Sequence, residues 1–441
     1  MTAPGLRTVT PCPPHGVRRS GARRSIARRA LATATTIAAV AVTVAGCAFG
    51  PPPPDQGGEP PNLPPPSASI PSDGGSTTVD VLAKHLSTPW GLAFLPDGTA
   101  LVTERASGKI LRVGLPQLAT GLTVTPIATV SGIDPTGEGG LLGIAASPNV
   151  TADHTVFLYY STAKDNRIGT VRLPASAFAP PASASPASPP GSPAPSTGPG
   201  SPPAGGSDAP PPAITPKPVL TGIPRGATDN GGWLAFGPDH MLYASTGDTG
   251  RPALSQNRAS LAGKILRMTA TGRPVAGGSL VYAIGLHNVQ GFAWDAAGQM
   301  FTVDTAGTDD GVLPIRAGAN YGWPTASPSP GSPSDSHIVP PIQTFPADQS
   351  GCAGVAAIDD IIATACLTGQ RLWLMQVTAG AVFGAPQPGL VGQFGRLRTT
   401  VTAPDGSLWI TTSNTDGDGT PASDDDQILR VVITDEGAGR L

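Results

Sequence analysis

The sequence has no long segment in which apolar residues recur with a helical period, and it is short of cysteine and of basic residues. The missing period argues against a mainly helical fold. Only four of the 441 residues are cysteines. Of the 27 basic residues, seven arginines precede Cys47, whereas none of the 30 acidic residues does. The rest of the chain therefore has 20 basic and 30 acidic residues. This negative balance argues against nucleic acid, or an anionic membrane surface, as the partner.

The first 46 residues have the pattern of an export signal. Six arginines in three pairs form a basic region, an apolar, alanine-rich stretch covers residues 30–46, and small residues then lead to Cys47. A cysteine in this place is typical of a bacterial lipoprotein, in which it becomes the lipidated first residue. We therefore predict a protein that is exported and lipid-anchored at Cys47 to the outer face of the cytoplasmic membrane. A plain signal peptide or a short membrane anchor is the alternative.

Proline-rich stretches separate the parts of the chain, because their composition cannot bury apolar surface. Residues 47–77 are predicted to form a disordered tether. Disordered insertions are predicted at about 175–218 and, more briefly, at about 326–335. We expect the folded domain to span residues 78–432 and a short tail to cover 433–441.

A strand, a turn and a second strand recur six times in the folded part. The turns of the six copies are marked by Asp97, Asn149, Asp239, Asp295, Asp359 and Asp405. With the two insertions left out, successive markers lie about 46–56 residues apart, which is the length of four short strands. A single hairpin cannot bury both of its faces, so the units must stack around an axis. We therefore predict an all-β fold, a six-bladed β-propeller of four-stranded antiparallel blades; a β-sandwich array fits the regular spacing less well.

Two cysteines remain for the folded part, Cys352 and Cys366, and they flank one predicted hairpin. Disulfides persist in exported proteins. We expect these two residues to pair; two buried thiols are the alternative.

Seven segments carry a further pattern: residues 88–105, 137–148, 231–250, 260–268, 285–295, 318–324 and 395–412. They include GEGGLLGIAASP, GLHNVQGFAWD and GANYGWP. Together they cover the globular part and resemble the soluble quinoprotein glucose/sorbosone (aldose sugar) dehydrogenases. The resemblance implies a six-bladed propeller that binds pyrroloquinoline quinone (PQQ) and usually calcium. It also implies a reaction that moves hydride from the anomeric carbon of a sugar to the quinone.

The resemblance places the catalytic base at one of two residues. The family has a proton-accepting histidine two residues before a glycine pair, and here Asp229 stands at that position. The arginine of the family's G-H-R-N-P-Q-G motif corresponds to His287. A carboxylate can serve as base where its surroundings raise its pKa. Asp229 and His287 are therefore the catalytic candidates; a turn or strand cap, and a pocket-lining or core histidine, are the alternatives.

The resemblance also implies the residues that bind ligands. Those expected at the cofactor are Asn288, Gln290, Arg396 and Arg398. PQQ carries three carboxylates, and the planar fork of arginine suits carboxylate. Because the two arginines lie two positions apart on a predicted strand, both should point to one face. A lysine that meets the quinone carboxylates in the family is replaced here by Thr368.

Substrate and metal sites follow from the same resemblance. Glu138 and Trp233 are expected on the substrate side. Asp309 and Asp310 precede the GANYGWP segment and are expected to help to bind calcium, which prefers oxygen ligands; acids of a solvated loop are the alternative. We expect Asp248 to hold its own loop through hydrogen bonds to backbone amides.

The predicted function is oxidation of a sugar or related alcohol, with electrons passing to an acceptor that the sequence does not identify. The alternative is a propeller with impaired catalysis that binds a carbohydrate, a small ligand or a protein at the cell surface. The replacement of the family histidine by Asp229 supports this alternative. Fold alone cannot decide between them, because function depends on the site.

Overall fold

The structure, a computed structural model, describes residues 69–72, 75–114, 123–178, 210–306, 309–326, 330 and 337–433. Several predicted segments lie outside these residues: the signal segment, Cys47, most of the tether, the central parts of both insertions and the tail beyond Ile433. In the part of the chain that is described, no helix has both the length and the apolar character needed to cross a membrane.

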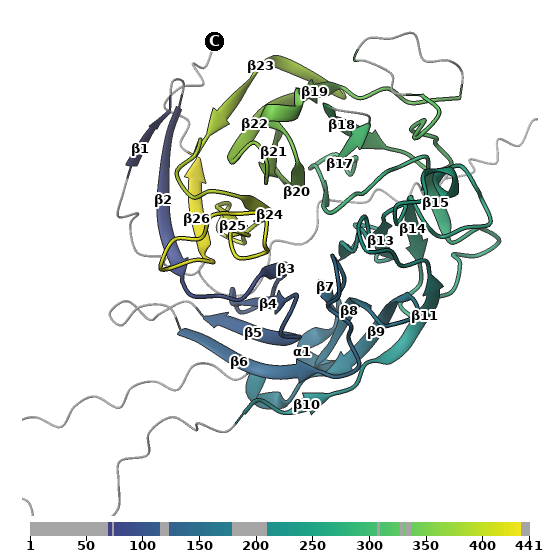
Figure 1. Ribbon diagram of the computed structural model, residues 1–441, viewed down its shortest axis with the longest axis vertical. Helices are drawn as coiled ribbons and strands as arrows, with labels where there is room; N and C mark the ends of the chain where they lie inside the picture. Colours follow the sequence, from purple (N-terminus) through teal and green to yellow (C-terminus); the bar gives the residue numbers. More distant parts are fainter. Residues whose placement is uncertain are drawn as a thin grey trace, which may run out of the picture. The chain divides into compact units, whose positions relative to one another are not determined.

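Six β-sheets surround one axis within the unit that spans residues 59–441, as Figure 1 shows. The all-β, six-bladed propeller is thus confirmed. Each blade is named here by its order along the chain. Blade 1 consists of β3 (Pro89–Phe94), β4 (Ala100–Glu104), β5 (Lys109–Gly114) and β6 (Thr123–Val130). Blade 2 consists of β7 (Leu141–Ala146), β8 (Thr155–Ser161), β9 (Asn166–Arg172) and β11 (Lys217–Ile223). Blade 3 consists of β12 (Leu234–Phe236), β13 (Leu242–Thr246), β14 (Lys264–Met268) and β15 (Val281–Ile284).

The second half of the ring repeats this order. Blade 4 consists of β16 (Phe292–Trp294), β17 (Met300–Ala306), β18 (Asp309–Ile315) and β19 (Gln343–Phe345). Blade 5 consists of β20 (Cys352–Ile358), β21 (Ile361–Cys366), β22 (Arg371–Thr378) and β23 (Ala381–Gly389). Blade 6 consists of β24 (Leu397–Thr402), β25 (Leu408–Thr412), β26 (Ile428–Ile433) and β2 (Gly75–Ala83). The helical elements in the described residues are the four short segments α1 (Val150–Asp153), η1 (Ala175–Ala177), η2 (Pro252–Ser255) and η3 (Ala347–Gln349).

The turn residues found in the sequence mark the blades correctly. Each of the six lies between the first and second strands of its blade. In blade 1 the Asp97 carboxylate accepts a hydrogen bond from the Thr99 backbone N–H, at 3.0 Å, and Gly98 has a φ of 79°. This is the chemistry of a tight Asp-Gly turn, and it explains why the repeat is visible in the sequence.

The ring closes through strands from the two ends of the folded part. Strand β2 pairs antiparallel with β26, with Asp80 opposite Arg430. The Arg430 guanidinium contacts the carboxylates of both Asp80, at 3.2 Å, and Asp405, at 3.0 Å. The strand that precedes blade 1 thus completes blade 6, which holds the two ends of the folded part together.

The structure corrects the predicted boundaries of the domain. Strand β1 (Ser69–Ser72) and the start of β2 lie within the stretch that was assigned to the tether. Strand β10 (Ala213–Ile214), which pairs parallel with β6, and the start of β11 lie within the predicted 175–218 insertion. Proline and serine lowered the local strand signal, whereas pairing with distant strands supplies the hydrogen bonds that the local sequence does not reveal.

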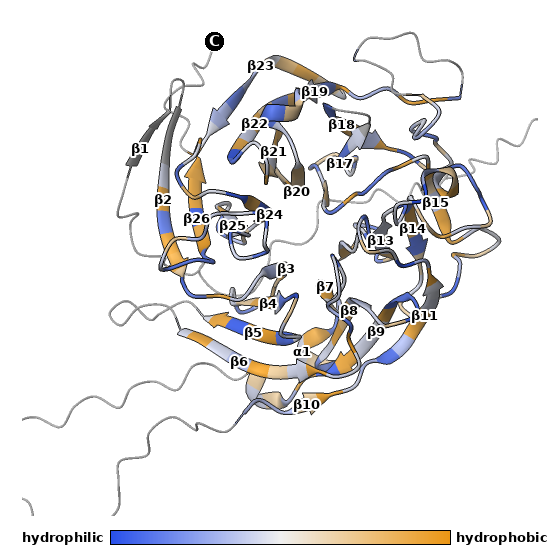
Figure 2. Cartoon of the chain, viewed as in Figure 1, coloured by the Kyte–Doolittle hydropathy of each residue, from blue (hydrophilic) through white to orange (hydrophobic). Residues whose placement is uncertain are grey.

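Packing between blades depends on close approach of their first strands. Gly143 of β7 lies against the Gly232 carbonyl before β12, so a Cβ at Gly143 would collide with that oxygen. Figure 2 shows hydrophobic and hydrophilic residues mixed along strands such as β5, which buries Ile110 and Val113 and keeps Lys109 half-buried. The core of the ring therefore lies between adjacent blades.

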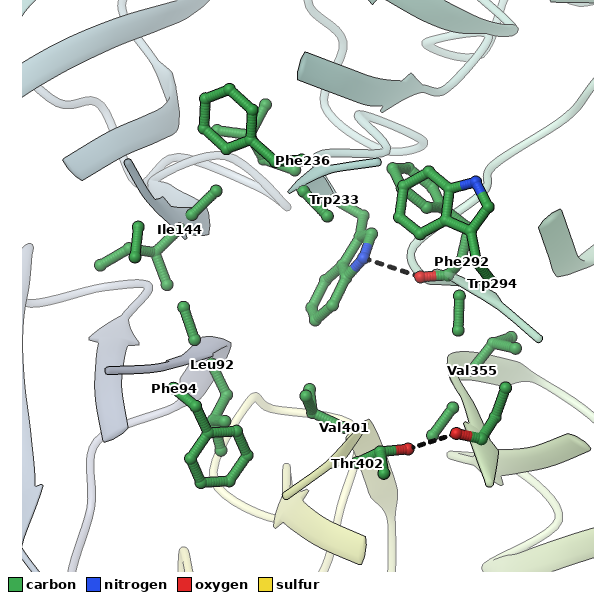
Figure 3. A pocket seen from close by; sticks show the side chains of 18 residues that line it. Leu92, Phe94, Ile144, Trp233, Phe236, Phe292, Trp294, Val355, Val401 and Thr402 are labelled. Carbon is green, nitrogen blue, oxygen red and sulfur yellow. Dashed lines mark hydrogen bonds between the residues drawn. The ribbon is translucent and has the colours of Figure 1, made fainter. Parts of the chain in front are cut away.

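The first strands of all six blades enclose an apolar cavity of about 380 Å³ at the centre, which Figure 3 shows from close by. Trp233 projects into this space, and its indole N–H donates to the Phe292 carbonyl at 3.1 Å. Across the cavity, the Thr402 hydroxyl donates to the Ala357 carbonyl at 2.7 Å. These bonds fix the lining, and they place Trp233 in the axial core.

The predicted disulfide is confirmed. Cys352 on β20 lies directly opposite Cys366 on β21, and their sulfur atoms are bonded. The bridge joins the two innermost strands of blade 5.

Candidate active site

Three loops of blades 3 and 4 are joined by backbone contacts. One precedes β12, the second follows β13 and the third connects β15 to β16. Gly247 and Asn288 form an isolated bridge between the second and third loops. The Asp248 N–H donates to the His287 carbonyl at 2.7 Å, and the Thr249 N–H donates to the Asp229 carbonyl at 3.0 Å. Segments far apart in the sequence therefore present their side chains together.

Asp229 is held in an unusual backbone conformation. Its φ is 55°, in the left-handed region that non-glycine residues seldom adopt. Its N–H donates to the Glu138 carboxylate at 2.8 Å, and the Thr228 hydroxyl donates to Asp229 Oδ2 at 2.7 Å. Neighbours on both sides thus determine where this carboxylate lies, as is common at functional sites. Glu138, which was predicted on the substrate side, lies beside it.

His287 is positioned through its backbone by a buried acid. Asp304 on β17 accepts the N–H groups of His287, at 2.7 Å, and Asn288, at 2.8 Å. Burial raises the pKa of Asp304 to about 6, although the two N–H groups and His287 act against the shift. Near neutral pH this carboxylate is therefore charged and fixes the start of the loop.

The two predicted catalytic residues face each other. His287 Nε2 lies 3.5 Å from Asp229 Oδ1. The Trp323 ring packs against the imidazole with the ring centres 4.7 Å apart, and its N–H donates to Asp248 Oδ2 at 2.8 Å. Within the described residues His287 Nδ1 is buried and has no hydrogen-bond partner, so Nε2 is the ring nitrogen that meets other groups.

Hydrogen bonds connect the predicted cofactor residues to the loops that carry Asp229 and His287. The Asn288 side-chain oxygen accepts the Gly231 N–H at 2.9 Å. Two residues later, the Gln290 side-chain oxygen accepts a hydrogen bond from Arg398 Nη1 at 2.7 Å. A contact between blades 4 and 6 thereby connects Asp229 and His287 to the two arginines.

The two predicted arginines pair with the acids of one loop. Arg396 and Arg398 both reach Asp416 Oδ2, at 3.3 and 3.2 Å, and both are largely buried. Arg396 also lies 3.7 Å from the exposed Asp418 carboxylate. Burial lowers the pKa of Arg398, Asp416 opposes this, and Arg105 and Arg396 add to it. Two largely buried guanidinium groups therefore share one largely buried carboxylate, whereas the second acid, Asp418, is exposed to solvent.

Asp248 and Asp310 have clear structural partners. As expected, Asp248 holds its loop, because Oδ1 accepts the Gly250 N–H at 2.8 Å. Asp310 is buried, and burial raises its pKa. It accepts hydrogen bonds from the Cys352 N–H and the Thr305 hydroxyl, both at 2.6 Å. Calcium binding at Asp309 and Asp310 stays a prediction.

Two other predicted positions lie apart from the polar cluster. Trp233 lines the axial cavity, with its N–H on the Phe292 carbonyl. Thr368 is exposed at the turn after β21, where it lies close to Gly351. No contact in the described residues joins either of them to Asp229 or His287.

Sequence reasoning missed several residues of this site. Trp323 belongs to the GANYGWP segment, which was used only to recognise the family. Asp416 was not predicted as a site residue. Asp304 had no sequence signal, because a single acid at the centre of a strand gives no hint that it meets a loop N–H group 16 or 17 residues away.

The structure thus combines a six-bladed propeller with a pair of arginines and a histidine–carboxylate pair. The chain belongs to the glucose/sorbosone dehydrogenase family, whose model matches residues 86–178 and 216–429. Among solved structures, the chain is similar to an aldose sugar dehydrogenase of Streptomyces coelicolor in its PQQ-bound form. The two share 38% identity and a TM-score of 0.68, over 81% of this chain and 98% of the other.

Two curated relatives have names that state an activity. The chain is 27% identical to quinoprotein glucose dehydrogenase B of Acinetobacter calcoaceticus, over 56% of this chain and 52% of that protein. It is 25% identical to an aldose sugar dehydrogenase of Escherichia coli, over 57% of this chain and 63% of that protein. The matched part thus spans less than two thirds of these relatives.

Proposed function

We propose that this protein is an exported, lipid-anchored, PQQ-dependent dehydrogenase that oxidises an aldose-type sugar or a related alcohol. The observation that carries the proposal is the connection of the paired arginines to the Asp229–His287 pair through Gln290 and Asn288. An anion site and a proton-accepting site lie next to each other, as a reaction between an anionic cofactor and a hydroxyl compound requires.

The residues present suit PQQ. Arg396 and Arg398 together carry two positive charges, and Asp416 supplies one buried negative charge. The contact of Arg396 with Asp418, at 3.7 Å, is screened because that carboxylate is exposed to solvent. The remaining charge would hold a carboxylate of the cofactor, and the Asn288 and Gln290 amides would bind its other polar groups. When bound, PQQ supplies the acceptor for the hydride.

The proton of the substrate hydroxyl passes to His287 in this proposal. The 3.5 Å between His287 Nε2 and Asp229 Oδ1 is longer than an ordinary hydrogen bond, so a hydroxyl can interact with both atoms. Imidazole is the more effective base near neutral pH. The Asp229 carboxylate then stabilises the positive charge that forms on the ring. Trp323 fixes the ring orientation.

Reconstitution tests the proposal. Purified full-length chain is incubated with PQQ and calcium, and the bound-quinone spectrum and dye reduction are measured with a panel of aldoses. We expect saturable quinone binding and sugar-dependent dye reduction. Absence of binding at micromolar PQQ would refute the cofactor assignment. Binding of PQQ or sugar without turnover would instead support the alternative of a binding protein.

The lipid anchor is proposed from the sequence around Cys47. Replacing Cys47 by alanine is expected to move the exported protein from the membrane fraction to the soluble fraction, because a stable anchor requires the thiol that carries the lipid. Fractionation followed by immunoblotting measures the change. Cys12→Ala is the matched control, because Cys12 precedes the predicted cleavage point. Equal membrane association of the Cys47 variant and the unmodified protein would disprove the anchor.

A further inference from the structure

We propose that Asp229, Asp248 and His287 form a binding site for one divalent transition-metal ion of the Zn²⁺ type. Each residue offers one ligand atom, and these three atoms all lie within 4.8 Å of one another. The site uses different residues from Asp309 and Asp310, where calcium was expected. It goes beyond the proposed dehydrogenase function and does not require PQQ to be bound.

The separation of the ligand atoms fits a shared ion. Zn²⁺ binds histidine nitrogen and carboxylate oxygen at about 2.0–2.2 Å, so two ligands of a tetrahedral ion lie about 3.4 Å apart. His287 Nε2 and Asp229 Oδ1 are 3.5 Å apart. This distance is too long for a good N–H···O hydrogen bond, but it leaves the room that a bridging ion needs.

The charges around the cluster also favour a cation. Asp248 is fully buried, and the hydrogen bonds that its carboxylate accepts come from the Gly250 N–H and the Trp323 indole. In the described part of the chain no lysine or arginine forms a salt bridge with Asp248 or Asp229. A buried carboxylate without a cationic partner is costly, and a divalent ion between the two carboxylates removes that cost.

The ligands are also held in place by other groups. The Gly250 N–H and Trp323 indole orient Asp248, the Thr228 hydroxyl orients Asp229, and Asp304 fixes the backbone of His287. Outer contacts set ligand orientation at metal sites; those of His287 act through its backbone and the Trp323 ring, since Nδ1 has no hydrogen-bond partner among the described residues. Nitrogen plus two oxygens is a donor set that suits zinc and its first-row neighbours.

Metal occupancy has a consequence for the proposed reaction. The same Nε2 that would accept the substrate proton becomes a metal ligand, so a bound ion and proton transfer compete for His287. This consequence rests on the proposed function, whereas the metal site itself does not. Stoichiometric Zn²⁺ is therefore expected to inhibit the reconstituted enzyme, and a chelator that binds Zn²⁺ in preference to Ca²⁺ is expected to restore activity.

Metal binding by the purified full-length chain tests the site. The protein is treated with chelator, dialysed and titrated without PQQ, with Zn²⁺ in a calorimeter and with Co²⁺ while visible absorption is recorded. We expect one ion per chain, and Co²⁺ bands that report nitrogen and oxygen ligands. Asp229→Asn, Asp248→Asn and His287→Ala should each weaken binding at least about 10-fold. His240→Asn and Asp418→Asn, which change exposed residues, should leave it unchanged.

Each outcome decides the proposal. One bound ion that all three ligand variants weaken supports the site. Absence of stoichiometric binding, or binding that His287→Ala does not change, overturns it, and equal losses in the two exposed controls show an adventitious ion only. Thermal unfolding without metal verifies that each variant is folded. Because PQQ is absent, failure here leaves the dehydrogenase proposal standing, and failed reconstitution leaves the metal site standing.

Discussion

Replacing His287 by alanine is expected to lower kcat for sugar oxidation by roughly 100- to 10,000-fold, which is the usual contribution of a general base. The variant removes the nitrogen that lies 3.5 Å from Asp229 Oδ1. Its contacts with the Asp304 carboxylate and the Asp248 N–H should persist, because on the His287 side they involve only backbone atoms. The measurement is dye reduction by protein reconstituted with PQQ and calcium, with a chelator that binds Zn²⁺ in preference to Ca²⁺ present so that the base alone is tested.

Asp229→Asn separates the two candidate bases. If His287 accepts the proton, this variant loses only the charge that stabilises the imidazolium and should lower kcat less than His287→Ala does. The reverse order would assign the proton to Asp229 and contradict our assignment. His240→Asn is the matched control, because His240 is exposed at the turn between β12 and β13.

The pH profile adds an independent readout. The pKa of Asp304 is raised to about 6. As pH falls through this value the carboxylate takes up a proton and becomes a weaker acceptor for the His287 and Asn288 N–H groups. Activity should therefore fall on the acid side, for this reason as well as through protonation of the base. Asparagine does not titrate, so Asp304→Asn should lower kcat at every pH. It should also remove the part of the fall in activity at acid pH that comes from protonation of Asp304.

Replacing Arg398 by methionine is expected to weaken PQQ binding by about 10- to 150-fold, which corresponds to a hydrogen bond to a charged group worth about 1.5–3 kcal/mol. The change removes one of the two guanidinium groups that share Asp416, and with it one positive charge of the site. It also breaks the 2.7 Å contact with Gln290. Fluorescence titration with PQQ measures the dissociation constant.

Two further variants show whether the geometry or the charge of Arg398 is responsible for its contribution to PQQ affinity. Arg398→Lys keeps the positive charge but loses the planar fork, so we expect an affinity between those of the unmodified protein and the methionine variant. Arg273→Met removes an exposed arginine of blade 3 and should change nothing. Unaltered PQQ affinity in Arg398→Met would remove Arg398 from the cofactor site.

The fold was largely predictable because its signal is local and repeated. Turn residues such as Asp97 and Asp405 form hydrogen bonds within two positions of themselves, so every blade carries its own marker. The boundaries were less predictable, since β2 pairs with β26, which lies at the other end of the folded part. The disulfide could be predicted because both cysteines flank a single hairpin.

The site was predictable only in part. Motif positions allowed seven site residues to be proposed one by one, and the structure connects them: Asp229, His287, Asn288, Gln290, Arg396, Arg398 and Glu138. The sequence did not indicate that the two catalytic candidates face each other, nor that Asp248 and Trp323 join them. These contacts cross between loops, and a motif carries information only about its own neighbours in the chain.

The sequence by itself determined the number of blades, the family and the residue types at the site, because these depend on local turns and short motifs. Only the tertiary structure decided which side chains meet. It brought a carboxylate and an imidazole, 58 positions apart in the chain, to 3.5 Å from each other. It also brought Gln290 to Arg398. It placed Trp233, which was expected on the substrate side, in the axial cavity. The physical reason is that the closed ring fixes the distances between blades. These distances decide which side chains of loops from different blades can contact one another.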